Sequence, residues 1–79
     1  MSSDQAIDLD IQIHTAHEAC NGEALAVLYR DAGLAEESLG NTDAACYFFT
    51  LAYVFALEVG DDVTAIDVRA RLVGYGREA

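Results

Sequence analysis

The 79-residue chain contains no lysine, no proline and no tryptophan, and it has only two cysteines and four arginines. The scarcity of cationic side chains excludes a basic patch of the kind that binds nucleic acid. Two cysteines, Cys20 and Cys46, are too few for a disulfide scaffold. No basic segment precedes the first apolar residues, so we expect no export signal. The sequence therefore predicts a cytoplasmic protein with both thiols reduced.

The charge of the chain is strongly negative. Fourteen acidic residues face four arginines, which gives a formal net charge of −10, and up to Asp62 only Arg30 opposes twelve acids. Such a field repels phosphate backbones and anionic lipid headgroups, so we expect neither nucleic acid nor a membrane as partner. The charge leaves three interpretations open: the protein binds a basic partner, it binds a cation, or the charge only keeps the protein soluble.

The segment from Ala44 to Leu57 is the most apolar in the chain. Thirteen of its fourteen residues are apolar or aromatic, and it holds five of the seven aromatic residues. A helix that is apolar on all sides must be covered on most of them. Fourteen helical residues span about 21 Å, less than the roughly 30 Å of a bilayer core. The segment is therefore predicted to be a buried central helix.

Periodicity predicts an all-α fold in one domain, 1–79, with residues 1–6 disordered. Glycines in three turns, Gly22, Gly40 and Gly60, are 18 and 20 residues apart and separate four antiparallel helices of similar length. The helices are expected at about 7–20, 23–39, 43–59 and 63–73, as two stacked hairpins. An aspartate of the Asp61–Asp62 pair is the expected N-cap of the last helix.

Two local patterns carry further expectations. Residues 7–13 alternate apolar and polar like a strand, but Leu9, Ile13, Ala16 and Cys20 also form a helical stripe. Helix is favoured because a lone strand has no pairing partner. In the last helix, the apolar residues Val63, Ile66, Ala70 and Val73 fall on one face.

The segment from Ala26 to Val59 resembles one tetratricopeptide repeat (TPR), a 34-residue helix–turn–helix unit. The resemblance is carried by Tyr29, Gly33, Leu39–Gly40, Ala45, Phe49 and Ala52. Gly33 lies inside a predicted helix, where glycine is unfavourable, so we expect another helix to pass close to it. Ala32 and Glu36 depart from the family pattern, and Leu57 replaces its proline, so the second helix can run longer. Gly60 and Ala65 repeat the spacing of Gly40 and Ala45, and the first helix would serve as the second helix of a preceding hairpin.

The resemblance implies a binding scaffold whose first helix lines a concave surface. By position, the implied binding residues are Val27, Arg30, Leu34, Glu37 and Ser38. A second resemblance involves Glu37–Ser38–Leu39, which is similar to the Asp-Ser-Leu motif of acyl carrier proteins. In that family the serine carries phosphopantetheine at a helix start, and the resemblance implies this role for Ser38, although Ser38 is expected near the end of the 23–39 helix.

Metal-binding and catalytic patterns are sparse. His14, His17 and Cys20 lie three residues apart and are the best candidate zinc ligands, although a fourth ligand is not evident. Cys46 lies inside the apolar helix, where burial makes a thiol unreactive. No phosphate-binding glycine loop and no acid–base carboxylate pair is present. We therefore expect no cofactor and no enzymatic activity.

The sequence thus predicts a small non-catalytic protein–protein interaction module that self-associates, with a homodimer as the expected form. The reason for self-association is that the 43–59 helix is apolar on more sides than its two chain neighbours can cover. An acyl-carrier-type protein modified on Ser38 and a metal-binding helical protein are the alternatives.

Overall fold

The computed structural model describes residues 3–77, and the side chains of residues 8–77. This part of the chain forms four helices: α1 (Ser3–Glu18), α2 (Gly22–Ser38), α3 (Thr42–Val59) and α4 (Asp62–Gly74). The predicted all-α fold class is confirmed, and the alternating segment 7–13 is helical. Residues 3–6, which we expected to be disordered, belong to α1, whereas Met1 and Ser2 lie outside the described residues.

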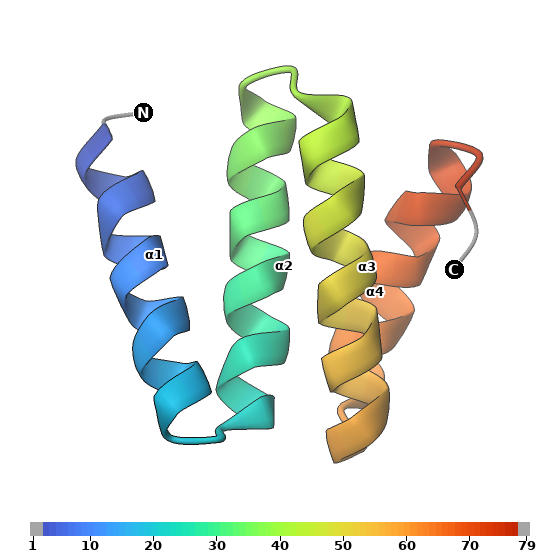
Figure 1. The fold of residues 1–79 in the computed structure, drawn as a ribbon. Coiled ribbons are helices and arrows are strands. Elements are labelled where there is room, and N and C mark those ends of the chain that lie inside the picture. Colours follow the sequence, from blue (N-terminus) through green and yellow to red (C-terminus); the bar gives the residue numbers. More distant parts are fainter. Residues whose placement is uncertain (1–2, 78–79) are drawn as a thin grey trace.

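The helices form a thin layer. In Figure 1, α1, α2 and α3 lie side by side and α4 lies behind α3. The backbone measures 31 × 30 × 15 Å. Helix α2 packs against α1, α3 and α4, and α3 packs against α2 and α4, while the backbones of α1 and α3 stay apart. Because a helix with its side chains is about 10–12 Å across, a layer this thin leaves broad faces of its helices uncovered.

The three turns between the helices have the same construction at an interval of 20 residues. Cys20, Gly40 and Gly60 adopt left-handed backbone conformations, with φ of 53°, 80° and 73°. After each of them, the next residue donates its N–H to the carbonyl five positions earlier, at 2.9, 2.9 and 2.8 Å. This is the Schellman helix ending. We expected Gly22 to lie in the first turn. Instead, Cys20 takes the left-handed conformation in that turn, and Gly22 is the first residue of α2.

Side chains after two of these turns cap the next helix. Asn21 accepts a hydrogen bond from the N–H of Ala24 at 3.1 Å, and Asp61 accepts one from the N–H of Thr64 at 3.1 Å. Each satisfies one of the free donors at a helix start. The expectation that an aspartate caps the last helix is therefore confirmed for Asp61.

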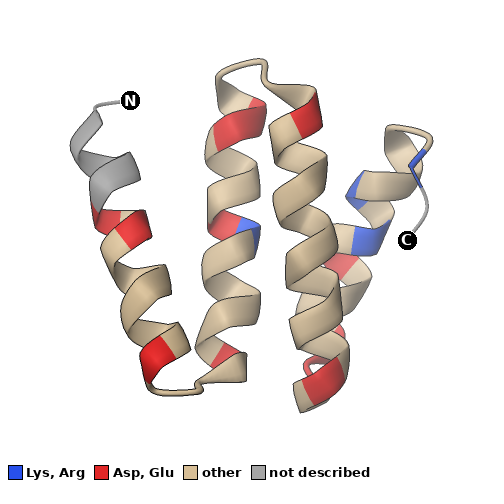
Figure 2. Cartoon of the chain, viewed as in Figure 1, with Lys and Arg blue, Asp and Glu red and all other residues tan. Residues whose placement is uncertain are grey.

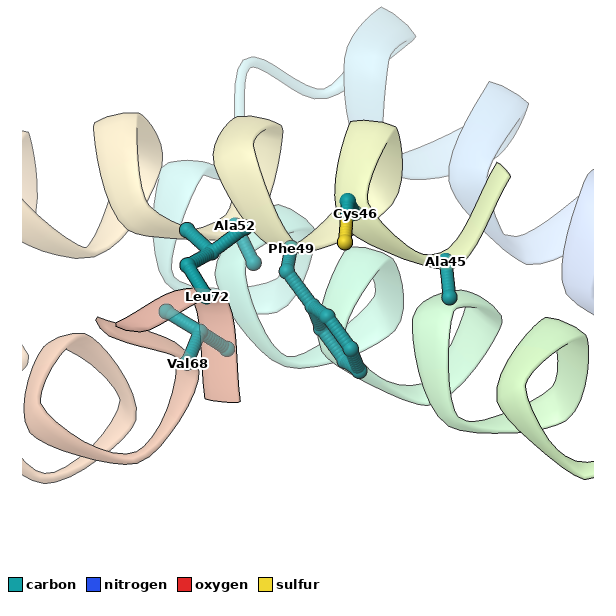
Figure 3. Close-up of a cluster of buried hydrophobic side chains, with 6 residues drawn as sticks. All are labelled: Ala45, Cys46, Phe49, Ala52, Val68 and Leu72. Atoms are coloured by element: carbon teal, nitrogen blue, oxygen red, sulfur yellow. The ribbon is translucent and has the colours of Figure 1, made fainter. Parts of the chain in front are cut away.

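The main core cluster joins α3 to α4 and reaches α2. Figure 3 shows its six buried side chains: Ala45, Cys46, Phe49 and Ala52 from α3, and Val68 and Leu72 from α4. Phe49 is fully buried, and its ring lies against Gly33 of α2. A Cβ atom on Gly33 would stand 2.5 Å from Cε1 of that ring. The prediction that another helix passes close to Gly33 is confirmed, and the close neighbour is Phe49.

Helix α3 extends over 18 residues, from Thr42 to Val59, which is longer than the apolar segment alone. At 1.5 Å per residue it measures about 27 Å. Within the described residues it is the one helix whose length and composition would also permit a membrane crossing. Core helices of folded domains meet the same criterion, and five residues of α3 are buried against its neighbours.

The contact between Gly33 and Phe49 predicts that Gly33→Ala destabilises the fold. Alanine in a helix normally gains up to about 1 kcal/mol over glycine. Here the added methyl group overlaps a fully buried ring, and overpacking costs about 1–3 kcal/mol. Chemical denaturation should therefore show a lower free energy of unfolding for Gly33→Ala.

Gly74→Ala is the matched control, because nothing lies within 4 Å of the added Cβ at this last residue of α4. That variant should be unchanged or more stable by up to about 1 kcal/mol. Equal stabilisation by the two substitutions would contradict the close packing of α2 on α3.

The cap of α4 predicts a pH dependence of stability. Hydrogen bonds from the Thr64 side chain and from its N–H lower the pKa of Asp61 below its ordinary value of 3.8, with a smaller contribution from the charge of Arg30. Because the pKa is lower in the folded state, the stabilisation is complete above the unfolded-state pKa and is lost as the pH falls through the folded-state pKa.

We therefore expect Asp61→Asn, which keeps a good N-cap but cannot ionise, to melt below the native protein at neutral pH. The difference in Tm should shrink as the pH is lowered below about 4. An NMR titration in which the Asp61 carboxyl shows an ordinary or raised pKa would refute this account.

Candidate functional site

The outer side of α3 is apolar and is not covered by any helix of the described chain. Tyr47 and Val54 are exposed and Leu51 is half-buried, and these three residues form an outer stripe along the helix. Figure 2 shows no charged residue on α3 between its two ends. The prediction that α2 and α4 do not cover all sides of this helix is confirmed.

The exposed face of α4 is also apolar. The residues buried in α4 are Thr64, Ala65, Val68 and Leu72. The stripe that we identified from the sequence faces solvent instead: Val63 is 77% exposed, Ile66 70% and Val73 45%.

The turn explains this orientation. The Asp61 carboxylate caps α4 through Thr64, and the N–H of Asp61 bonds to the carbonyl of Ala56. These two bonds fix the rotation of α4 about its own axis relative to α3. Ala65 is buried five residues after Gly60, just as Leu25 and Ala45 are buried five residues after the left-handed residues of their own turns. Helix α4 therefore has two apolar faces, and the face that lies inside is the one with Ala65, Val68 and Leu72.

A shallow groove of about 250 Å³ runs between α3 and α4. It is lined by six residues, two from α3 and four from α4: Tyr53, Leu57, Asp62, Ala65, Ile66 and Arg69. Leu57 and Ile66 contribute exposed apolar surface, 56% and 70% exposed. Across the described part of the chain, neither Asp62 nor Arg69 takes part in an intramolecular ion pair, whereas Arg30, Arg71 and Arg77 each do.

The five binding residues implied by the TPR resemblance do not form one site. Leu34 and Ser38 line a groove of about 490 Å³ between α1 and α2, together with Asp8, Leu9, Gln12, Asp31 and Ala35. Val27 is half-buried and does not line this groove. Two of the five positions therefore line a groove. The sequence alone could not predict this groove, because α1 forms one of its sides.

Glu37 and Arg30 serve contacts within the fold. Glu37 accepts a hydrogen bond from Arg71 at 3.2 Å and one from the Tyr75 hydroxyl at 2.6 Å, and this bond to Glu37 raises the pKa of Tyr75. Arg30 lies 3.7 Å from Asp31, and its Nε is buried with no hydrogen-bond partner in the described structure. Glu37 thus ties α2 to α4.

The candidate zinc ligands are not brought together. His14 pairs with Glu18 at 3.2 Å, and Nε2 of His17 lies 2.9 Å from the hydroxyl of Tyr29. Cys20 is exposed in the turn. Among the described residues, no group of three or more His, Cys, Asp or Glu side chains is placed to hold a metal ion.

An aromatic cluster that the sequence did not reveal joins the first three helices. The ring of Tyr29 stacks between those of Phe48 and Phe55 at centroid distances of 6.0 and 5.8 Å, and the ring of His17 packs edge-on against Tyr29 and Phe55. Desolvation in this cluster raises the pKa of Tyr29. Edge-to-face and offset contacts at these distances stabilise beyond burial alone. His17 therefore brings α1 into contact with α3.

Ser38 is exposed as the last residue of α2. It precedes the Leu39–Gly40 turn, whereas the acyl-carrier resemblance implies a serine at a helix start. We expect co-expression with a phosphopantetheinyl transferase to leave the intact mass of the protein unchanged, and Ser38→Ala to have the same mass spectrum apart from the lost oxygen. A mass increase that depends on Ser38 would favour the carrier alternative.

The described chain therefore presents a groove between α1 and α2, a groove between α3 and α4, and uncovered apolar surfaces on α3 and on α4. These features are available for contact with another molecule, and they are the basis for inferring a function. Comparison with protein-family models, with curated proteins and with solved structures finds no match for this chain.

Proposed function

We propose that the protein is a small non-catalytic protein–protein interaction module that self-associates, with a homodimer as its basic form. The observation that carries this proposal is the apolar surface left exposed on α3 and α4. Tyr47, Leu57, Val63 and Ile66 are each more than half exposed. Contiguous exposed apolar surface marks interaction sites in folded proteins.

The energetics favour an occupant for this surface. Full burial of a valine, leucine or isoleucine side chain stabilises by about 1.5–3 kcal/mol relative to exposure. A chain of this length buries only about 60% of its unfolded surface, so its own core leaves a narrow stability margin. A second copy would add buried apolar area without lengthening the chain.

The TPR resemblance belongs to this proposal. A stack of helical hairpins is a binding scaffold, and its open end exposes the apolar face that a further helix would cover. The contact of Gly33 with Phe49 fits the close crossing of the two helices in such a hairpin. The acidic field of the chain supports a protein partner in the cytoplasm over nucleic acid or an anionic membrane.

The proposal predicts a dimer or larger assembly at micromolar concentration, measured by light scattering coupled to gel filtration of the purified, untagged protein. Sedimentation velocity over a dilution series should show the mass falling towards 8.5 kDa as the protein dissociates. A monomer at every concentration would overturn self-association. Recovery of the native protein in the membrane fraction would instead favour α3 as a membrane segment.

A further inference from the structure

The exposed apolar surface on α4 lies on the helix that carries two of the chain's four arginines. Figure 2 shows arginines on α4 and on the turn that follows it, and none on the coloured part of α1. Arg69, Arg71 and Arg77 are three of the four cationic residues of the chain, whereas the described helix α1 carries acids and no arginine. Two copies that each carry a net charge of −10 can therefore approach with less repulsion on their α4 sides than on their α1 sides.

The exposed face of α4 has a charge pattern that complements itself. Asp62, Ile66, Arg69 and Val73 follow one another at intervals of 4, 3 and 4 residues, so they share one side of the helix. Asp62, Ile66 and Arg69 also line the groove with Leu57 of α3. Asp62 and Arg69 are about 10 Å apart along the axis, two turns from each other, with Ile66 near their midpoint.

We propose that this surface, formed by Leu57, Val63, Ile66 and Val73 with Asp62 and Arg69 beside them, binds a second copy of the same chain. The two α4 helices pack antiparallel about a twofold axis at Ile66. In that arrangement Asp62 of each copy faces Arg69 of its partner. A parallel arrangement would set aspartate against aspartate and arginine against arginine, so the charges select the antiparallel one.

The arrangement is isologous, because both copies use the same surface and the contact closes at two subunits. It places Ile66 of each copy at the centre, where interface side chains contribute most to affinity. Asp62 of each copy pairs with Arg69 of the other copy, so neither of these two charges is left unpaired in the interface. The inference rests on the proposed self-association and specifies its surface, orientation and symmetry.

The first test compares Ile66→Glu with Ile11→Glu by sedimentation velocity. Both isoleucines are exposed, 70% and 60%, so both variants should fold, and circular dichroism verifies this. Ile66→Glu should raise the dimer dissociation constant at least about tenfold. Ile11→Glu, on α1, should leave it unchanged.

The second test uses the charges. Asp62→Arg alone and Arg69→Asp alone should each weaken the homodimer, because like charges then face each other. The double variant Asp62→Arg/Arg69→Asp should restore the homodimer. A mixture of the two single variants should form a heterodimer, since unlike charges then meet at both positions.

The outcomes distinguish the α4 interface from self-association through some other surface. A native dimer that survives Ile66→Glu, or a double variant no better than the single ones, overturns the α4 interface and leaves self-association standing. A native protein that is monomeric at all concentrations overturns both. Loss of the dimer in Ile66→Glu but not in Ile11→Glu, with charge-swap restoration, supports the antiparallel arrangement.

Discussion

The packing of the Phe49 ring against Gly33 is the contact on which the rest of the structure depends. Phe49 is fully buried where α2 and α3 meet, and the ring fills the space that the missing side chain of Gly33 leaves. The core cluster that contains Phe49 also includes Val68 and Leu72 of α4. One side chain therefore sets the distance of α3 from α2 and also helps form the surface on which α4 packs. Because buried side chains are close-packed, a change at this point is transmitted to three of the four helices.

The turns decide which face of each helix is inside. Each consists of a left-handed residue followed by a residue whose N–H bonds back five positions, and the construction recurs at residues 20, 40 and 60. So short a connection leaves a helix little freedom to rotate about its axis. For α4 the result is a buried face that includes Thr64 and an exposed face that includes Val63 and Ile66. The buried face also contains the apolar residues Ala65, Val68 and Leu72, so α4 is apolar on two faces and only one of them is covered within the described chain.

The thin layer of helices and the uneven charge act together on function. The three-helix layer, with α4 on one side, leaves the outer stripe of α3 uncovered and produces separate grooves beside α2 and beside α4 (Figure 1). The strong negative charge would keep copies apart if it were evenly spread, but three of the four arginines lie on α4 and on the turn after it (Figure 2). The molecule therefore combines long-range repulsion over most of its surface with one apolar region where approach is less opposed. This combination favours a contact of defined geometry over non-specific aggregation.

The sequence by itself determined the all-α class, the approximate bounds of the helices, the aspartate cap of α4 and the need for a close contact at Gly33, because these follow from local periodicity and from the stereochemistry of single residues. It also indicated that α3 has more apolar surface than its neighbours can cover. It did not determine the rotation of α4, the left-handed conformation of Cys20, the aromatic cluster around Tyr29 or the groove that includes Leu34 and Ser38. Those features depend on how helices distant in the chain are placed, and only the tertiary structure decided them, since an apolar stripe shows which residues share a face and does not show which face is buried.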